Sequence, residues 1–248
     1  MDYVLSSWKM YLSVSETERL FGAIQAGLRE RIDSGRALPR VILCPSFLSV
    51  VPLRAMADDE VVALGAQNCH WEDDGAYTGE ISAKMLRGLV EFVLVGHSER
   101  RDAGETDDQI ARKVAAVVRN GMVPILLVGE DGRGEDALKQ VEARLRHGVS
   151  LLDLAEQQVV FVYEPTWAIG KDETAPADRI RRSVSHLKGV LGELGAKEPK
   201  IIYGGSVDED NVDELLEIDV LDGVGVGRAS LDAERFLRII DRVATAAT

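Results

Sequence analysis

The chain has 248 residues, a formal net charge of −13, and apolar and charged fractions that are ordinary for a folded globular protein. A charge of this sign argues against a surface that binds nucleic acid or anionic lipid, although a local basic site for a small anion is compatible with it. The two cysteines, Cys44 and Cys69, lie in or beside apolar runs, so we expect buried free thiols. Without a signal-peptide pattern or an apolar run near the ~20 residues of a membrane span, we expect a cytoplasmic protein.

Short apolar runs alternate with amphipathic stretches along the whole chain. The predicted strands are Asp2–Trp8, Arg40–Cys44, Val61–Ala66, Phe92–Gly96, Val123–Val128, Val159–Glu164, Lys200–Tyr203 and Gly223–Val226. The predicted helices are Ser13–Ile32, Ser46–Met56, Ser82–Leu89, Thr106–Asn120, Glu135–His147, Pro176–Leu194, Glu209–Leu216 and Asp232–Ala247. The helix Thr106–Asn120 has the clearest boundaries, because Thr106 and Gln109 have capping-box spacing and Gly121 follows.

Eight strand–helix units predict a parallel sheet, and their number matches a closed (β/α)8 barrel that takes up residues 1–248 as a single domain. No linker rich in serine, proline or glycine separates the units. The alternative architecture is a doubly wound open sheet that binds a dinucleotide. Its glycine fingerprint is not met, because Arg228 stands where the spacing from Gly223 and Gly225 requires a third glycine.

Chemically useful residues follow several of the predicted strands, and in a barrel those strand ends share one rim. Lys9 follows the first strand, His97 the fourth, and Glu164 ends the sixth. Glycine-rich turns follow the last two strands, Gly204-Gly205-Ser206 and Gly225-x-Gly227. Each signal alone has an ordinary structural explanation, but together they predict a cation, an imidazole, a carboxylate and a phosphate cradle on one rim. No His, Cys, Asp or Glu cluster has metal-ligand spacing, so we expect no metal.

The surroundings of two of these residues indicate acid–base chemistry. Glu164 ends a continuous apolar run and is followed by Pro165 and an apolar loop tip, which is typical of a base shielded from water. Ser98 and Glu99 look like the first turn of a helix, and its peptide dipoles would favour a neutral His97.

Six segments resemble the triosephosphate isomerase family, in that family's order along the chain. They are Trp8-Lys9-Met10, Gly65–Cys69, Tyr77–Glu80, Gly96–Arg101, Tyr163–Gly170 and Tyr203–Ser206. The resemblance covers essentially the whole chain. It implies a cofactor-free aldose–ketose isomerase that interconverts dihydroxyacetone phosphate and glyceraldehyde 3-phosphate through an enediol intermediate.

The resemblance also implies a role for individual residues. Glu164 matches the base, His97 the electrophile that donates to the carbonyl oxygen, and Lys9 the cation that attracts the phosphate and stabilises the oxyanion. The positions matched to substrate and phosphate binding are Ser7, Gly170, Ser206, Gly227 and Arg228. Supporting positions are Glu99 beside the lysine, Ile169 in a closing lid over Pro165–Ala175, and Gly205.

By the same resemblance, the protein is expected to form a homodimer through the loop 67–80. Tyr77-Thr78-Gly79 would insert beside Lys9 of a second subunit, so that the dimer completes each site. A loop of this length between a strand and a helix is also longer than most, which favours a function for it. The alternative is a floppy surface loop, which Glu72-Asp73-Asp74 would suit.

The chain departs from the family pattern near the predicted pocket. Ser7 stands in place of an asparagine, Gly225 in place of the usual leucine, and Arg228 in place of a glycine whose positive φ would strain an arginine. The lid reads Lys171-Asp172-Glu173 where Thr-Gly-Lys is usual. Because the base, electrophile and lysine are retained, we expect the reaction type to survive. Two alternatives stay open: an isomerase of a larger ketose phosphate such as a tetrulose (erythrulose) phosphate, and a non-catalytic phosphometabolite-binding protein.

Overall fold

A computed structural model describes residues 1–134, 136–168 and 174–245. Eight parallel strands form a closed barrel in chain order, with each strand pairing with the next and β8 pairing back onto β1. The strands are β1 (Tyr3–Ser7), β2 (Arg40–Cys44), β3 (Ala63–Ala66), β4 (Phe92–Val95), β5 (Val123–Val128), β6 (Val160–Tyr163), β7 (Lys200–Gly204) and β8 (Gly223–Val226). The predicted (β/α)8 barrel is confirmed, and the open doubly wound sheet is excluded because this sheet has no edge.

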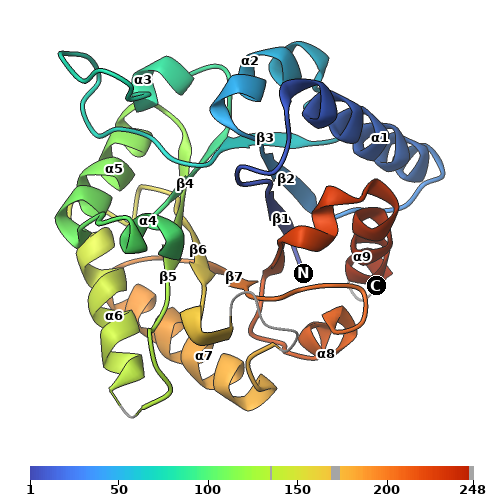
Figure 1. Ribbon diagram of the computed structural model, residues 1–248. Helices are drawn as coiled ribbons and strands as arrows, with labels where there is room; N and C mark the ends of the chain where they lie inside the picture. Colours follow the sequence, from blue (N-terminus) through green and yellow to red (C-terminus); the bar gives the residue numbers. More distant parts are fainter. Residues whose placement is uncertain (135, 169–173, 246–248) are drawn as a thin grey trace.

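Helices surround the barrel on the outside, as Figure 1 shows. They are α1 (Val14–Asp33), α2 (Phe47–Met56), α3 (Ala83–Leu86), α4 (Ser98–Asp102), α5 (Asp107–Arg119), α6 (Ala137–Gly148), α7 (Ala177–Glu193), α8 (Val212–Leu216) and α9 (Ala233–Thr245). Two 3-10 helices, η1 (Thr166–Ala168) and η2 (Arg228–Leu231), follow β6 and β8. None of the described helices has the length and apolar content that crossing a membrane requires.

Both faces of the strands are buried. Their sequences are therefore continuous apolar runs, without the alternation of apolar and polar residues that is typical of a strand with one exposed face. One set of alternate side chains fills the barrel interior and the other packs against the helices. The interior set is Leu5, Ile42, Cys44, Ala63, Phe92, Leu94, Ile125, Leu127, Val160, Val162 and Ile202.

Local capping decides where several helices begin and end. The capping box predicted for α5 is present, with Thr106 and Gln109 each accepting from the other's backbone N–H. The predicted helix 82–89 is too long, because Gly88 adopts a φ of +79° and α3 ends at Leu86. The predicted helix 209–216 starts late for a similar local reason. Asp208 accepts the backbone N–H of Asn211, and this turn delays the start of α8.

A buried lysine of α5 ties this helix to the loop that follows β3. Lys113 pairs with Glu105, and their side chains are 4% and 2% exposed. The Lys113 ammonium also donates to the side-chain oxygen of Asn68 at 2.9 Å. Charges this deeply buried are stable only when paired, so Glu105 holds the Lys113 ammonium in place. The hydrogen bond from Lys113 to Asn68 then fixes the base of the loop 67–80.

Candidate active site

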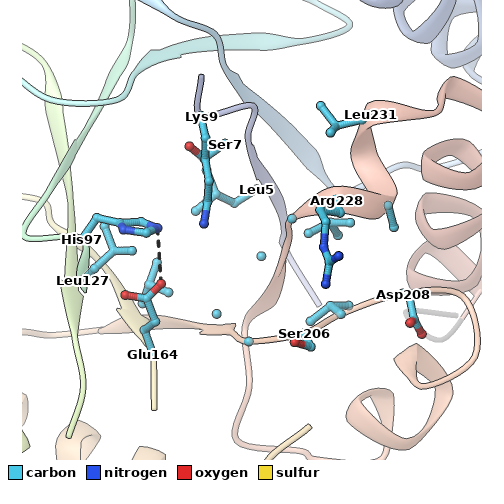
Figure 2. A pocket seen from close by; sticks show the side chains of 18 of the residues that line it. Leu5, Ser7, Lys9, His97, Leu127, Glu164, Ser206, Asp208, Arg228 and Leu231 are labelled. Atoms are coloured by element: carbon cyan, nitrogen blue, oxygen red, sulfur yellow. Dashed lines mark ion pairs between the residues drawn. The ribbon is translucent and has the colours of Figure 1, made fainter. Parts of the chain in front are cut away.

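A cavity of about 970 Å³ opens at the carboxyl ends of the strands, where the sequence predicts the site. Every predicted site residue within the described part of the chain lines it: Ser7, Lys9, His97, Glu99, Glu164, Gly205, Ser206, Gly227 and Arg228. Ile169 and Gly170 lie outside the described residues, as does the altered lid segment 171–173. Figure 2 shows His97 and Glu164 together on one side of the cavity, with Arg228 across from them.

His97 is held in one tautomer by the helix that follows it. Its Nδ1 accepts the backbone N–H of Glu99 at 3.1 Å, where α4 begins. A ring nitrogen that accepts a hydrogen bond carries no proton, so the neutral imidazole carries its proton on Nε2. Nε2 faces the cavity and lies 3.4 Å from Oε1 of Glu164 (Figure 2). The helical turn expected at Ser98 is confirmed.

Glu164 lies just beyond β6 with its side chain only 9% exposed. Its other oxygen, Oε2, accepts the backbone N–H of Ser98 at 3.1 Å. The carboxylate therefore lies against the start of α4, where the Ser98 N–H and the His97 imidazole are its close polar partners. A carboxylate in such a setting has few water molecules to displace before it contacts a substrate.

Lys9 adopts a φ of +46°, the one positive value at a described residue other than glycine. Such a conformation costs energy and is retained only when neighbouring contacts enforce it. Gln67 provides one of them, since its side-chain nitrogen donates to the carbonyl oxygens of Lys9 and Cys44, both at 3.0 Å.

Backbone strain was predicted at Arg228 instead, and that prediction is wrong. Arg228 begins the 3-10 helix η2 with an ordinary φ.

Glu99 pairs with Lys9 at the cavity edge, with 2.6 Å between Oε1 and the ammonium. Partial burial acts to raise the pKa of Glu99, but the hydrogen bond and charge of Lys9 outweigh it and leave the pKa below its ordinary value. Glu99 is therefore charged at neutral pH and orients the lysine.

The turns after β7 and β8 present unused backbone donors to the cavity. The N–H groups of Ser206 and Gly227 have no hydrogen-bond partner among the described residues. Gly205 cannot be replaced without rearrangement, because a Cβ there would lie 2.4 Å from the Tyr203 hydroxyl oxygen. Free N–H groups on a tight glycine turn form the kind of concavity that binds a phosphate.

The described ends of the predicted lid are both anchored. At the first end, Trp167 Nε1 lies 3.4 Å from Oε1 of Glu130, and Thr166 donates to the Glu130 carbonyl oxygen through its backbone N–H and its hydroxyl. At the second end, the Ala175 N–H donates to the Tyr203 hydroxyl at 2.9 Å.

The sequence reasoning missed two residues that support the site. Glu130 is 1% exposed and accepts from the Tyr163 hydroxyl at 2.8 Å and the Arg179 guanidinium at 3.0 Å. Gln67 holds Lys9, as described above. Both lie just past the carboxyl end of a strand, so comparing all eight strand ends would have found them.

The fold and this site define a barrel enzyme that transfers protons on a small anionic substrate. No group of three or more His, Cys, Asp or Glu in the described part of the chain is arranged to hold a metal ion.

Comparison with known proteins specifies the family. The family model for triosephosphate isomerase matches residues 2–243. Triosephosphate isomerases of Herpetosiphon aurantiacus, Nostoc punctiforme and Dehalococcoides mccartyi are 44%, 39% and 37% identical to the chain. These alignments cover 94%, 96% and 97% of this chain and 96% of each relative. The chain belongs to the triosephosphate isomerase family and is an isomerase.

Proposed function

We propose that the protein interconverts dihydroxyacetone phosphate and glyceraldehyde 3-phosphate, with Glu164 as the base, His97 as the electrophile and Lys9 as the electrostatic partner of the substrate. One observation carries this assignment. A nearly dry carboxylate, a neutral imidazole with its N–H toward the cavity, and an ammonium come from three separate strand ends and line one cavity.

The proposed reaction begins when Glu164 leaves the Ser98 N–H and removes a proton from the carbon beside the carbonyl. The Nε2 proton of His97 then bonds to the substrate oxygen rather than to Glu164, and the Lys9 ammonium stabilises the negative charge that develops there. Returning the proton to the neighbouring carbon completes the isomerisation. The free N–H groups of Ser206 and Gly227 hold the phosphate of the triose.

The purified protein is expected to isomerise both triose phosphates without any added cofactor, and to retain this activity after dialysis against EDTA. In deuterium oxide the product should carry deuterium at the carbon that receives the proton. The proton that Glu164 has removed can exchange with solvent while the enediol is present, so deuterium is returned to carbon in its place. Mass spectrometry of the product measures the incorporation. A protein that binds triose phosphate but neither isomerises nor exchanges it would contradict the proposal and favour a non-catalytic binding protein.

We also propose a homodimer that includes the loop 67–80. Large apolar side chains are exposed on this loop and on the neighbouring elements of the first half of the barrel: Met10, Tyr11, Leu48, Val51, Tyr77 and Met85. Met10, beside the catalytic lysine, is 96% exposed. An apolar surface of this kind favours a protein interface, and its position supports a subunit contact next to Lys9.

Thr78→Arg is expected to shift the protein toward monomer and to lower activity in parallel, because a cation at the loop tip would be buried in the proposed interface. Sedimentation velocity and kcat/KM, measured over the same range of protein concentrations, check the two effects. Ser185→Arg is the matched control. It places the same cation at an exposed position of α7, outside the proposed interface, where it should change neither property. A wild-type protein that is monomeric and fully active would overturn the dimer.

We propose a reducing, cytoplasmic setting for the enzyme. Cys44 and Cys69 are both free and buried. Burial raises the pKa of the Cys69 thiol to about 12, so little reactive thiolate forms at neutral pH. Inert, unpaired thiols support this setting.

A further inference from the structure

The cavity offers space and charge beyond what a three-carbon phosphate uses. We infer that the same site also isomerises a four-carbon ketose phosphate that carries its phosphate on the carbon farthest from the carbonyl, with Gly225 and Arg228 determining this specificity. The inference rests on the proposed function, because the chemistry at Glu164, His97 and Lys9 is unchanged.

Gly225 leaves open space in the cavity wall. It lies within β8 and lines the cavity. A Cβ at this position would meet only the Tyr203 carbonyl oxygen at 3.4 Å and Gly204 Cα at 3.5 Å, which are ordinary contact distances. Its φ is not positive, so neither the backbone nor the packing requires a glycine, in contrast to Gly205. The missing side chain is therefore volume available to a ligand.

Ser7 adds a polar group to the same cavity. It ends β1, two residues beyond Leu5, which is the partner of Gly225 in the pairing of β1 with β8. Its hydroxyl has no hydrogen-bond partner among the described residues. A four-carbon ketose phosphate differs from a triose phosphate by one carbon that carries a hydroxyl, and this added group needs both space and a polar partner.

Arg228 supplies an unused cation on the side of the cavity where Ser206 offers its free N–H group (Figure 2). Within the described part of the chain, its guanidinium makes no ion pair or hydrogen bond, although the chain has 42 acidic residues against 29 basic ones. Its cavity neighbour Arg235 differs, because it pairs with Glu209 at 2.6 Å. Figure 2 shows the Arg228 side chain directed into the cavity near Ser206. A guanidinium binds phosphate oxygens in pairs and reaches farther than a backbone N–H.

These features fit one substrate geometry. One more carbon between the carbonyl and the phosphate moves the phosphate away from Glu164, toward the Arg228 guanidinium. The inserted carbon then lies along the open wall at Gly225. The reaction is balanced without an external oxidant. Glu164 moves a proton from C1 to C2, and a second proton passes from the C1 oxygen to the C2 oxygen. The C1 hydroxyl thereby becomes an aldehyde and the C2 carbonyl becomes a hydroxyl.

The first test compares kcat/KM of the wild-type protein for dihydroxyacetone phosphate, a tetrulose 4-phosphate and a tetrulose 1-phosphate. We expect kcat/KM for the tetrulose 4-phosphate to be no more than tenfold lower than kcat/KM for dihydroxyacetone phosphate. A closely fitted pocket would instead lower kcat/KM for a substrate with one extra carbon by roughly 10–200-fold. A triose preference above tenfold overturns the inference and leaves the proposed function intact. A preference for the 1-phosphate over the 4-phosphate overturns the placement of the added carbon. Inactivity toward all three compounds counts against the proposed function itself.

The second test measures the ratio of the two kcat/KM values, tetrulose 4-phosphate over triose phosphate, in variants. Gly225→Leu should lower this ratio about tenfold or more by filling the wall, and Gly225→Ala should lower it less. Arg228→Met should raise KM for the four-carbon substrate more than for the triose, and Arg228→Lys should recover part of the loss. Arg238→Met removes a cation outside the cavity and should leave the ratio unchanged. Because both substrates are measured on one sample, partial misfolding does not alter the ratio. An unchanged ratio in Gly225→Leu overturns the inference.

Discussion

Glu164→Gln is expected to lower kcat for triose phosphate isomerisation by roughly 10²–10⁴-fold with little change in KM. The amide keeps the size of the side chain and can still accept the Ser98 N–H, but it cannot take a proton from carbon. Deuterium incorporation from solvent should fall together with kcat, because both require the same proton transfer. Steady-state kinetics and product mass spectrometry measure the two effects.

The control for this variant is Glu156→Gln, which makes the same chemical change at an exposed carboxylate and should leave kcat unchanged. Circular dichroism would show that both variants keep the barrel. If Glu164→Gln retained wild-type kcat, the base would have to be another group. Glu99 is then the candidate, since its carboxylate also lines the cavity, and Glu99→Gln would carry the loss instead.

Strand positions could be predicted from the sequence because burial on both faces leaves a strong local signal. The bounds of β2, β5 and β8 match their predictions to the residue. In each case an apolar run rich in β-branched residues or glycine is bounded by polar or turn-forming neighbours. Helix ends were harder to place where a single residue decides them. Gly88 shortens α3 through its left-handed backbone, and such a φ depends on surroundings that the sequence does not display.

The reacting groups could be placed together because the barrel puts all strand ends on one rim. From that rule we predicted that Glu164, His97 and Lys9 lie together, although they are far apart in the chain. In the structure all three line one cavity. The strain at Lys9 could not be predicted in this way. It depends on Gln67, which reaches across from the end of β3 to hold the Lys9 backbone. A hydrogen bond between such distant residues leaves no periodic pattern in the sequence.

The turn after β8 shows why the strain was assigned to the wrong residue. Gly227 adopts φ −85° and ψ −116°, which completes the turn one residue before Arg228. Arg228 is then free to begin η2 in a helical conformation and to direct its side chain into the cavity (Figure 2). The substitution of an arginine here thus changes the charge of the site without straining its backbone.

Lys113→Met is expected to lower the free energy of unfolding by about 3–5 kcal/mol, the usual result of removing one partner of a buried ion pair. Methionine fills a similar volume, but it leaves the Glu105 carboxylate 2% exposed with no cation beside it. Oε2 of Glu105 already lacks a hydrogen-bond partner. Since domains are typically stable by only about 5–15 kcal/mol, urea denaturation at a fixed protein concentration should show a large shift of the midpoint.

Two further variants separate the effect of the unpaired charge from that of lost packing. Lys139→Met removes a lysine whose ion pair with Asp136 is almost fully exposed, and its midpoint should stay at the wild-type value. The double variant Glu105→Leu/Lys113→Met removes both buried charges, so it should recover much of the stability that the single variant loses. If the double variant is as unstable as the single one, the loss comes from packing around α5 and from the broken Asn68 contact. The buried charge of Glu105 would then not be its cause.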